Sequence, residues 1–265
     1  MQPRHFLALS LLLTVLLAVP WVARAAVVGR FVKVEGYVDL LKQGKLPAVP
    51  VKAQDGVEPG DVIRTKSKAK VQVQFVDDTF LTIAPESRVA IADYVFDPVS
   101  RERRAVLKVF RGLTHTVVKR LLDVQEPDFT MHTLTAIIRV QGTQWYTLLK
   151  PNATYAFLPQ GLLGISSINP NIPARLILKS GEFTRVLLDQ PPGPARPFTP
   201  ADLDLLKKLM DSGVPDVARF EPPGEAQASP LSKIPRPDIP ERSIPLAVPP
   251  TYSPEYPSGG THPSK

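Results

Sequence analysis

The sequence predicts a mainly β protein of short strands, with one helix near the C-terminus and a disordered, proline-rich tail. Apolar and polar residues alternate strictly over 70–75, which places Val71, Val73 and Phe75 on one face of a strand. Runs of about five strand-forming residues recur with turn signals roughly every 8–12 residues, as in all-β domains. Proline makes up 30 of the 265 residues, which is about twice its average share, so part of the chain is not expected to pack.

Residues 1–25 have the pattern of a signal peptide. A short basic start at Arg4 precedes an apolar run from Phe6 to Val19, and Ala23-Arg24-Ala25 supplies a small-x-small cleavage site. The apolar run is shorter than the roughly 20 residues that a membrane-spanning helix requires. We therefore expect cleavage after Ala25 and export to the periplasm without a stable membrane span. Association with the envelope or release from the cell stays open.

The predicted β-domain extends over residues 26–190. Glycine and proline punctuate it at short intervals, and the segment 46–59 reads as a loop because it contains three prolines. Between such breaks, alternating or β-branched residues favour strands. A turn at Gly112 is expected to separate two of these strands. The expected strands cover residues 28–34, 36–40, 62–65, 70–75, 80–83, 89–96, 106–110, 113–122, 129–133, 145–149, 155–158, 164–168, 174–178 and 183–188.

An amphipathic helix is predicted over residues 199–213. Thr199 is a good N-cap, Pro200 suits the first helical position, and Gly213 ends the run. Four apolar side chains share one face and should lie against the sheet, namely Leu203, Leu206, Leu209 and Met210. The tail at 214–265 has 13 prolines and no apolar periodicity. Such a segment cannot bury enough surface to offset chain ordering, so we expect it to be disordered.

The region 60–143 contains a series of short motifs in a fixed order. They are Pro59-Gly60-Asp61-x-Ile63-Arg64-Thr65, an Asp77-Asp78 hairpin, Pro85-x-Ser87-x-Val89-x-Ile91-x-x-Tyr94, Leu107-x-Val109-x-x-Gly112, Thr133-x-x-Ala136 and Gly142-Thr143. This succession resembles the FecR domain, a β-rich, solenoid-like or roll-like periplasmic module. Asp78 stands where that family usually has glycine, and Gln141 stands where it usually has arginine. Arg139 could supply the missing guanidinium.

The resemblance implies a periplasmic module that contacts a protein or an envelope polymer and carries no chemistry. In the signalling members of the family, this domain follows a cytoplasmic segment that regulates a sigma factor, and then one membrane helix. Only five residues precede the apolar run here. Control of a sigma factor in cis is therefore not expected, whereas a role in trans stays open.

Basic and aromatic side chains are the candidates for binding. Clustered arginines can attract an anionic envelope polymer, although they can equally be the solvated rim of a sheet. Aromatic residues can stack on sugars, and they are also favoured in strands for packing. The candidates are Arg64, Arg101, Arg103, Arg104, Arg139, Trp145 and Tyr146. Lys119, Arg120, Tyr37 and Tyr94 belong to the same groups.

No residue is expected to be catalytic. Asp77 and Asp78 are adjacent on an extended chain and point opposite ways, so a hairpin turn explains them better than acid–base chemistry. Ser87 has no Gly-x-Ser-x-Gly elbow and no evident base. Gly142-Thr143 lacks the lysine and the spaced glycines of a phosphate loop. A hydrolase is therefore the least favoured class of protein.

No metal or other cofactor is expected either. The chain contains no cysteine, which excludes thiolate metal sites and disulfides. His115 and His132 lack the neighbouring carboxylates that would complete a zinc site.

Two functional hypotheses remain. The first is an exported, non-catalytic binding or sensory module that recognises a protein partner or an envelope glycan, with no nucleic-acid partner. The alternative is a structural envelope protein that self-associates through exposed sheet edges. The oligomeric state and the identity of the ligand stay open.

Overall fold

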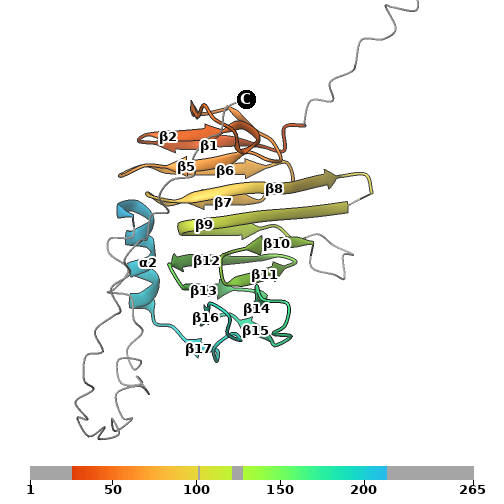
Figure 1. Ribbon diagram of the computed structural model, residues 1–265, viewed down its shortest axis with the longest axis vertical. Helices are drawn as coiled ribbons and strands as arrows, with labels where there is room; N and C mark the ends of the chain where they lie inside the picture. Colours follow the sequence, from red (N-terminus) through yellow and green to blue (C-terminus); the bar gives the residue numbers. More distant parts are fainter. Residues whose placement is uncertain (1–25, 101, 121–127, 214–265) are drawn as a thin grey trace, which may run out of the picture. The chain divides into compact units, whose positions relative to one another are not determined.

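The computed structural model describes residues 26–100, 102–120 and 128–213 (Figure 1). This part of the chain is mainly β with one α-helix near its C-terminal end, as the sequence predicts, and it contains 17 strands. It contains no helix with the length and apolar character that a membrane crossing requires. The predicted signal peptide at 1–25, the predicted tail at 214–265 and the candidate Arg101 lie outside the described residues.

The strands are short except for β9. Their bounds are β1 Gly29–Glu35, β2 Val38–Leu41, β3 Val49–Pro50, β4 Gly56–Val57, β5 Val62–Thr65, β6 Lys70–Phe75, β7 Phe80–Ile83, β8 Arg88–Asp97, β9 Glu102–Val118, β10 Phe129–His132, β11 Ala136–Val140, β12 Thr143–Lys150, β13 Ala153–Gln160, β14 Leu162–Ser167, β15 Arg175–Lys179, β16 Glu182–Leu187 and β17 Arg196–Pro197. A 3₁₀ turn, η1, covers Lys42–Gly44. The α-helix, α2, covers Pro200–Ser212.

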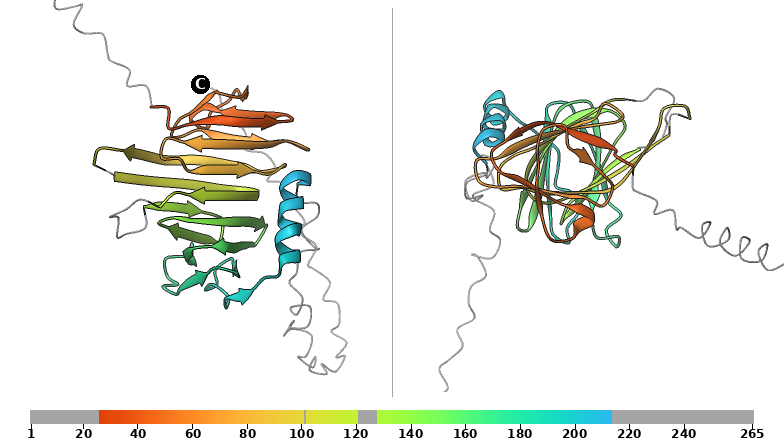
Figure 2. Two further views of the ribbon diagram at one scale, coloured as in Figure 1. Left: turned by 180° about the vertical axis from the view of Figure 1, so that it is seen from behind. Right: turned by 90° about the horizontal axis from the view of Figure 1, so that it is seen from above.

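The strands form two sheets that share β9. Sheet A has the order β4-β1-β6-β7-β9-β12-β13-β16-β17. Sheet B has the order β3-β2-β5-β8-β9-β10-β11-β14-β15. All pairs are antiparallel except β9 with β10. The chain passes repeatedly from one sheet to the other and adds strands to both, which confirms the predicted roll (Figures 1 and 2).

The prediction of two strands separated at Gly112 is wrong. Residues 102–118 form one strand, whose first half pairs with β8 and β10 in sheet B and whose second half pairs with β7 and β12 in sheet A. Gly112 has φ +97°, a conformation that glycine adopts without steric cost. The chain therefore bends into the second sheet here without losing its ladder of hydrogen bonds.

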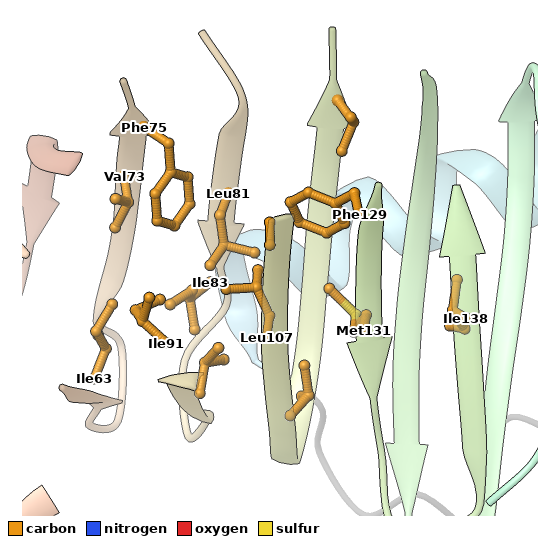
Figure 3. Close-up of a cluster of buried hydrophobic side chains, with 14 of the residues drawn as sticks. Ile63, Val73, Phe75, Leu81, Ile83, Ile91, Leu107, Phe129, Met131 and Ile138 are labelled. Atoms are coloured by element: carbon orange, nitrogen blue, oxygen red, sulfur yellow. The ribbon is translucent and has the colours of Figure 1, made fainter. Parts of the chain in front are cut away.

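The core lies between the two sheets. Strand β6 alternates as predicted, with Val71, Val73 and Phe75 buried. They belong to one core cluster with apolar side chains of other strands, among them Leu81 of β7 and Leu107 of β9 (Figure 3). Each such side chain contributes about 1.5–3 kcal/mol when it is fully buried.

Helix α2 begins and ends as its sequence predicts. The Thr199 side chain accepts a hydrogen bond from the Asp202 N–H, and Asp202 in turn accepts one from the Thr199 N–H, which completes a capping box. Gly213 follows the last turn with φ +81°. Leu206, Leu209 and Met210 are buried, and the helix contacts β9 while it runs across the strand direction (Figure 2). Lys70 of β6 pairs with Asp211 at 2.5 Å.

Candidate functional site

The first motif residues hold a turn together. Gly60 has φ +91°, and the Asp61 side chain is fully buried behind it. The Asp61 carboxylate accepts hydrogen bonds from Lys42 Nζ at 2.9 Å, the Gln43 N–H at 3.1 Å and the Glu58 N–H at 3.0 Å. Because buried polar groups need such partners, Gly60 and Asp61 are structural residues.

Arg64 is committed to an ion pair on sheet B. Its guanidinium donates to both carboxylate oxygens of Asp39, at 2.5 and 2.9 Å, and Lys66 approaches the same carboxylate at 3.1 Å. Burial alone would raise the pKa of Asp39, but the hydrogen bonds from Arg64 and Lys66 outweigh it and lower that pKa. The pKa of Arg64 is raised by its hydrogen bonds to Asp39.

Thr65, Ser87 and Gly112 form a second structural cluster. The Thr65 hydroxyl donates to the Ala84 carbonyl at 2.7 Å and accepts from the Ser87 N–H at 2.9 Å. The Ser87 hydroxyl accepts from the Leu113 N–H at 3.2 Å. A Cβ atom at Gly112 would lie only 1.9 Å from Ser87 Oγ. Ser87 therefore packs in the bend of β9 and has no exposed hydroxyl for catalysis.

Arg103 lies inside the protein, not on its surface. Its side chain has 0% exposure, and all five guanidinium N–H groups have acceptors. They reach Asp77 at 2.9 Å, Asp128 at 2.7 and 2.8 Å, the Lys119 carbonyl at 2.9 Å and the Gln141 carbonyl at 3.2 Å. Burial opposes the charge on Arg103, but the hydrogen bonds to Asp128 and Asp77 raise its pKa. No donor is left for a partner.

The Asp77-Asp78 hairpin anchors this cluster. Asp77 is buried, and it also accepts hydrogen bonds from the Tyr94 hydroxyl at 2.7 Å and the Thr79 hydroxyl at 2.8 Å. Burial and the nearby Asp77 charge raise the pKa of Tyr94. Asp78 is exposed with φ +63° and pairs with Lys119 at 2.9 Å. A left-handed aspartate thus replaces the expected glycine, and the guanidinium of Arg103 contacts the Gln141 carbonyl.

The aromatic candidates do not present a stacking surface. Trp145 is fully buried, packs edge-on against Phe129 at 5.9 Å between ring centroids, and donates its indole N–H to Thr147 at 2.9 Å. Tyr146 is also buried and stacks on His115 at 4.3 Å. Both side chains stabilise the fold, which is the packing alternative that the sequence left open.

The later motif residues close turns between the sheets. The Thr133 hydroxyl lies 3.1 Å from the Ala136 carbonyl and 2.7 Å from the Thr154 hydroxyl. The Thr143 hydroxyl donates to the Gln160 carbonyl at 2.5 Å. A Cβ atom at Gly142 would lie 2.4 Å from Arg120 Cβ, so Gly142 lets the chain carrying Arg120 pass close by.

A groove of about 580 Å³ opens on the outer face of sheet B, over β11, β14 and β15. We call it the arginine groove and define it by Arg120, Arg139, Leu162, Gly164, Arg175 and Ile177. Arg139 lies opposite Gly164, which lies opposite Ile177 on β15. Because Gly164 has no side chain, the middle of this row is hollow.

The charges of the arginine groove are not balanced within the described residues. Arg139 donates to the Ser166 hydroxyl at 3.1 Å, and Ser166 lies opposite Arg175. Of the described carboxylates, none pairs with Arg120, Arg139 or Arg175. Leu162 and Ile177 are 61% and 58% exposed. The groove can therefore hold an anion beside an apolar group.

Of the sequence candidates that the structure describes, Arg120 and Arg139 lie in this groove. Arg104 is exposed on β9 and pairs with Asp93 at 2.8 Å. Sequence reasoning missed Arg175 and Gly164, because only the register of β11, β14 and β15 brings them to Arg139. His115 and His132 lie on different sheets, and the described chain gathers no three His, Asp or Glu side chains that could hold a metal ion.

Comparison with known proteins confirms the resemblance for the middle of the chain. Residues 61–158 match the family model described as FecR protein. Two crystal structures described as a "putative anti-sigma factor" from Parabacteroides distasonis ATCC 8503 share 14% identity with this chain at a TM-score of 0.43. Each comparison covers 54% of this chain and 62% of the other, which is less than two thirds of the relatives' length. A search of curated proteins found no match.

Proposed function

Because residues 61–158 match the FecR family, we propose that the protein is an exported, non-catalytic binding or sensory module of the cell envelope. It recognises a protein or polymer of the envelope through the arginine groove. The predicted signal peptide at 1–25 supports export to the periplasm. In this proposal the FecR motif residues stabilise the fold, and the residues of the arginine groove contact the partner.

The observation that carries this proposal is the difference between the arginines of the groove and the other described arginines that the sequence offered as binding candidates. Arg64 and Arg103 are held by aspartates, and Arg104 pairs with Asp93. The three arginines of the groove have no such partner among the described carboxylates. They surround exposed apolar side chains in a hollow of the size that ligand sites occupy.

Site-specific photo-crosslinking in living cells tests the proposal. We would place p-benzoylphenylalanine at Ile177, inside the groove, and at Leu46, which is 79% exposed near the opposite end of sheet B. We expect a discrete envelope adduct from position 177 and none from position 46. No adduct at 177, or the same adducts at both positions, would contradict the proposal.

Self-association through sheet edges is the second candidate. Strand β15 pairs with β14 alone among the described strands, so its other edge is open to a second copy. However, antiparallel pairing of two copies about Ile177 would set Arg175 opposite Lys179, and like charges in that position are destabilising. Size-exclusion chromatography with light scattering separates the two candidates, because a concentration-independent monomer excludes assembly through this edge.

A further inference from the structure

We infer that the arginine groove takes an extended acidic peptide segment of a partner protein, with one carboxylate between Arg139 and Arg175 and an apolar neighbour on Ile177 and Leu162. The inference rests on the proposed function and names the chemistry of the partner. It follows from the two arginines at Ser166, the position of Arg120 and the lining of the groove.

The proposed position of the peptide carboxylate follows from the residues that lie side by side on β11, β14 and β15 of sheet B. Arg139 turns along the face of the sheet to donate to Ser166, and Arg175 is the cross-strand neighbour of Ser166, at roughly 5 Å between Cβ atoms. One arginine thus contacts Ser166, and a second arginine lies directly opposite it on the next strand. A carboxylate placed between them relieves their repulsion and accepts charge-assisted hydrogen bonds from both.

A second cationic position lies further along the groove. The backbone of Arg120 packs against Gly142, which is three residues beyond Arg139 in the chain. Arg120 and Arg139 both line the groove, which suits a ligand with two anionic groups on one extended segment. Glu-x-x-Glu places two carboxylates three residues apart, at roughly 10 Å.

The lining favours a peptide over a sugar polymer. The walls contribute Leu162 and Ile177, which are aliphatic and largely exposed, and none of the described residues that line the groove is aromatic. Aliphatic walls bury apolar side chains, whereas a flat aromatic face is the side chain suited to stacking on a sugar ring. A peptide can supply an apolar residue between its two carboxylates.

Gly164 allows the groove to be filled without distorting the backbone. A Cβ atom there would lie 3.6 Å from the Arg139 carbonyl oxygen and 3.7 Å from Ile177 Cδ1, which are ordinary contacts. The residue has no left-handed φ. Gly164→Val should therefore fold normally and occupy the space that the apolar residue of the peptide needs.

Fluorescence anisotropy with purified full-length protein tests the inference. The probes are fluorescein-labelled Gly-Glu-Leu-Ala-Glu-Gly and its counterpart with both Glu replaced by Gln, with an oligogalacturonate as the anionic sugar. Of these three probes, we expect only the Glu peptide to bind. Arg139→Gln, Arg175→Gln and Gly164→Val should each raise its Kd tenfold or more. Arg104→Gln, at an exposed arginine outside the groove, should change Kd less than twofold. Added salt should weaken binding.

Three results would overturn the inference: no binding of the Glu peptide, equal binding of the Gln peptide, or an equal loss with Arg104→Gln. Binding of oligogalacturonate in place of the peptide would assign the groove to an acidic sugar. The proposed function is judged separately by the crosslinks from position 177. If those appear and persist with Arg139→Gln and Arg175→Gln, the module binds a partner but does not recognise its carboxylates.

Discussion

At the scale of single residues, the buried charge of Arg103 decides how the middle of the chain is arranged. Its guanidinium connects Asp77 in the β6–β7 hairpin with Asp128 before β10 and with the carbonyls of Lys119 and Gln141. Removing one partner from such a cluster leaves buried charge uncompensated, which costs more than the ion pairs themselves contribute.

Arg103→Leu should therefore lower the free energy of unfolding by about 3–5 kcal/mol, because Asp77 and Asp128 keep their burial and lose their cation. Arg104→Gln on the same strand is the control. Its ion pair with Asp93 is exposed, so its loss should cost less than about 1 kcal/mol. Urea unfolding monitored by circular dichroism measures both, and equal losses would show that the Arg103 cluster is not a buried unit.

His115 makes the stability depend on pH. It stacks on Tyr146 in sheet A, and burial lowers its pKa to about 4, while an unfolded histidine titrates near 6.5. Between these two pKa values the unfolded state binds more protons than the folded state. The contribution of His115 to the free energy of unfolding is therefore fully present above a pH of about 6.5 and declines as the pH falls toward 4.

His115→Gln should remove this part of the decline. We expect the wild-type protein to lose stability more steeply than the variant between pH 6.5 and 4 and in parallel with it above pH 7. Urea midpoints across that range give the comparison, in which the carboxylates contribute equally to both proteins. Parallel curves throughout would mean that His115 is not held neutral by burial.

Residue roles were predictable from the sequence where they are local. Asp77 and Asp78 form the expected hairpin, and Thr199 and Gly213 delimit the helix, because turns and caps depend on neighbouring residues. The partners of Arg103 could not be predicted, since Asp128 and Asp77 lie 25 and 26 residues away. Arg103 and Trp145 were surface candidates for the same reason: their type is visible in the sequence, whereas their burial depends on which strands surround them.

At the scale of elements, β9 determines how the two sheets are joined. Glycine in a strand pattern commonly marks a turn or a bend, and the sequence alone could not distinguish the two at Gly112. Ser87 explains why the chain bends at Gly112 and does not turn back. Its side chain occupies the space where a Cβ atom of residue 112 would lie, and its hydroxyl accepts a hydrogen bond from the Leu113 N–H just past the bend.

Gly112→Ala should destabilise the protein by about 3 kcal/mol or more, because it combines a left-handed φ with a clash against Ser87. Gly181→Ala is the matched control. Gly181 also has a positive φ, of +84°, but its Cβ position is open, so only conformational strain of about 1–2 kcal/mol applies. Thermal unfolding of the two variants compares them, and equal losses would remove the packing role assigned to Ser87.

At the scale of the whole described fold, the alternation of the strands predicted the buried face and the β class but not the pairing. Period-two patterns determine which side chains face inward. They do not determine which strands are neighbours, and the parallel pairing of β9 with β10 has no local signal. The arginine groove was hidden for the same reason, since it exists only where β11, β14 and β15 meet in register.

The shared strand leads to a last prediction, that the two sheets unfold together. Residues of sheets A and B form one core cluster. Because β9 pairs with strands of both sheets, loss of its pairing in one sheet should disturb its pairing in the other. Trp145 lies in that core, so its fluorescence reports the packing between the sheets, while far-UV circular dichroism reports the strands. Both signals should give one coincident urea transition, which Gly112→Ala shifts to lower urea as a whole. If the fluorescence changed at a lower urea concentration than the dichroism, the sheets would separate before they unfold, and β9 would not couple them.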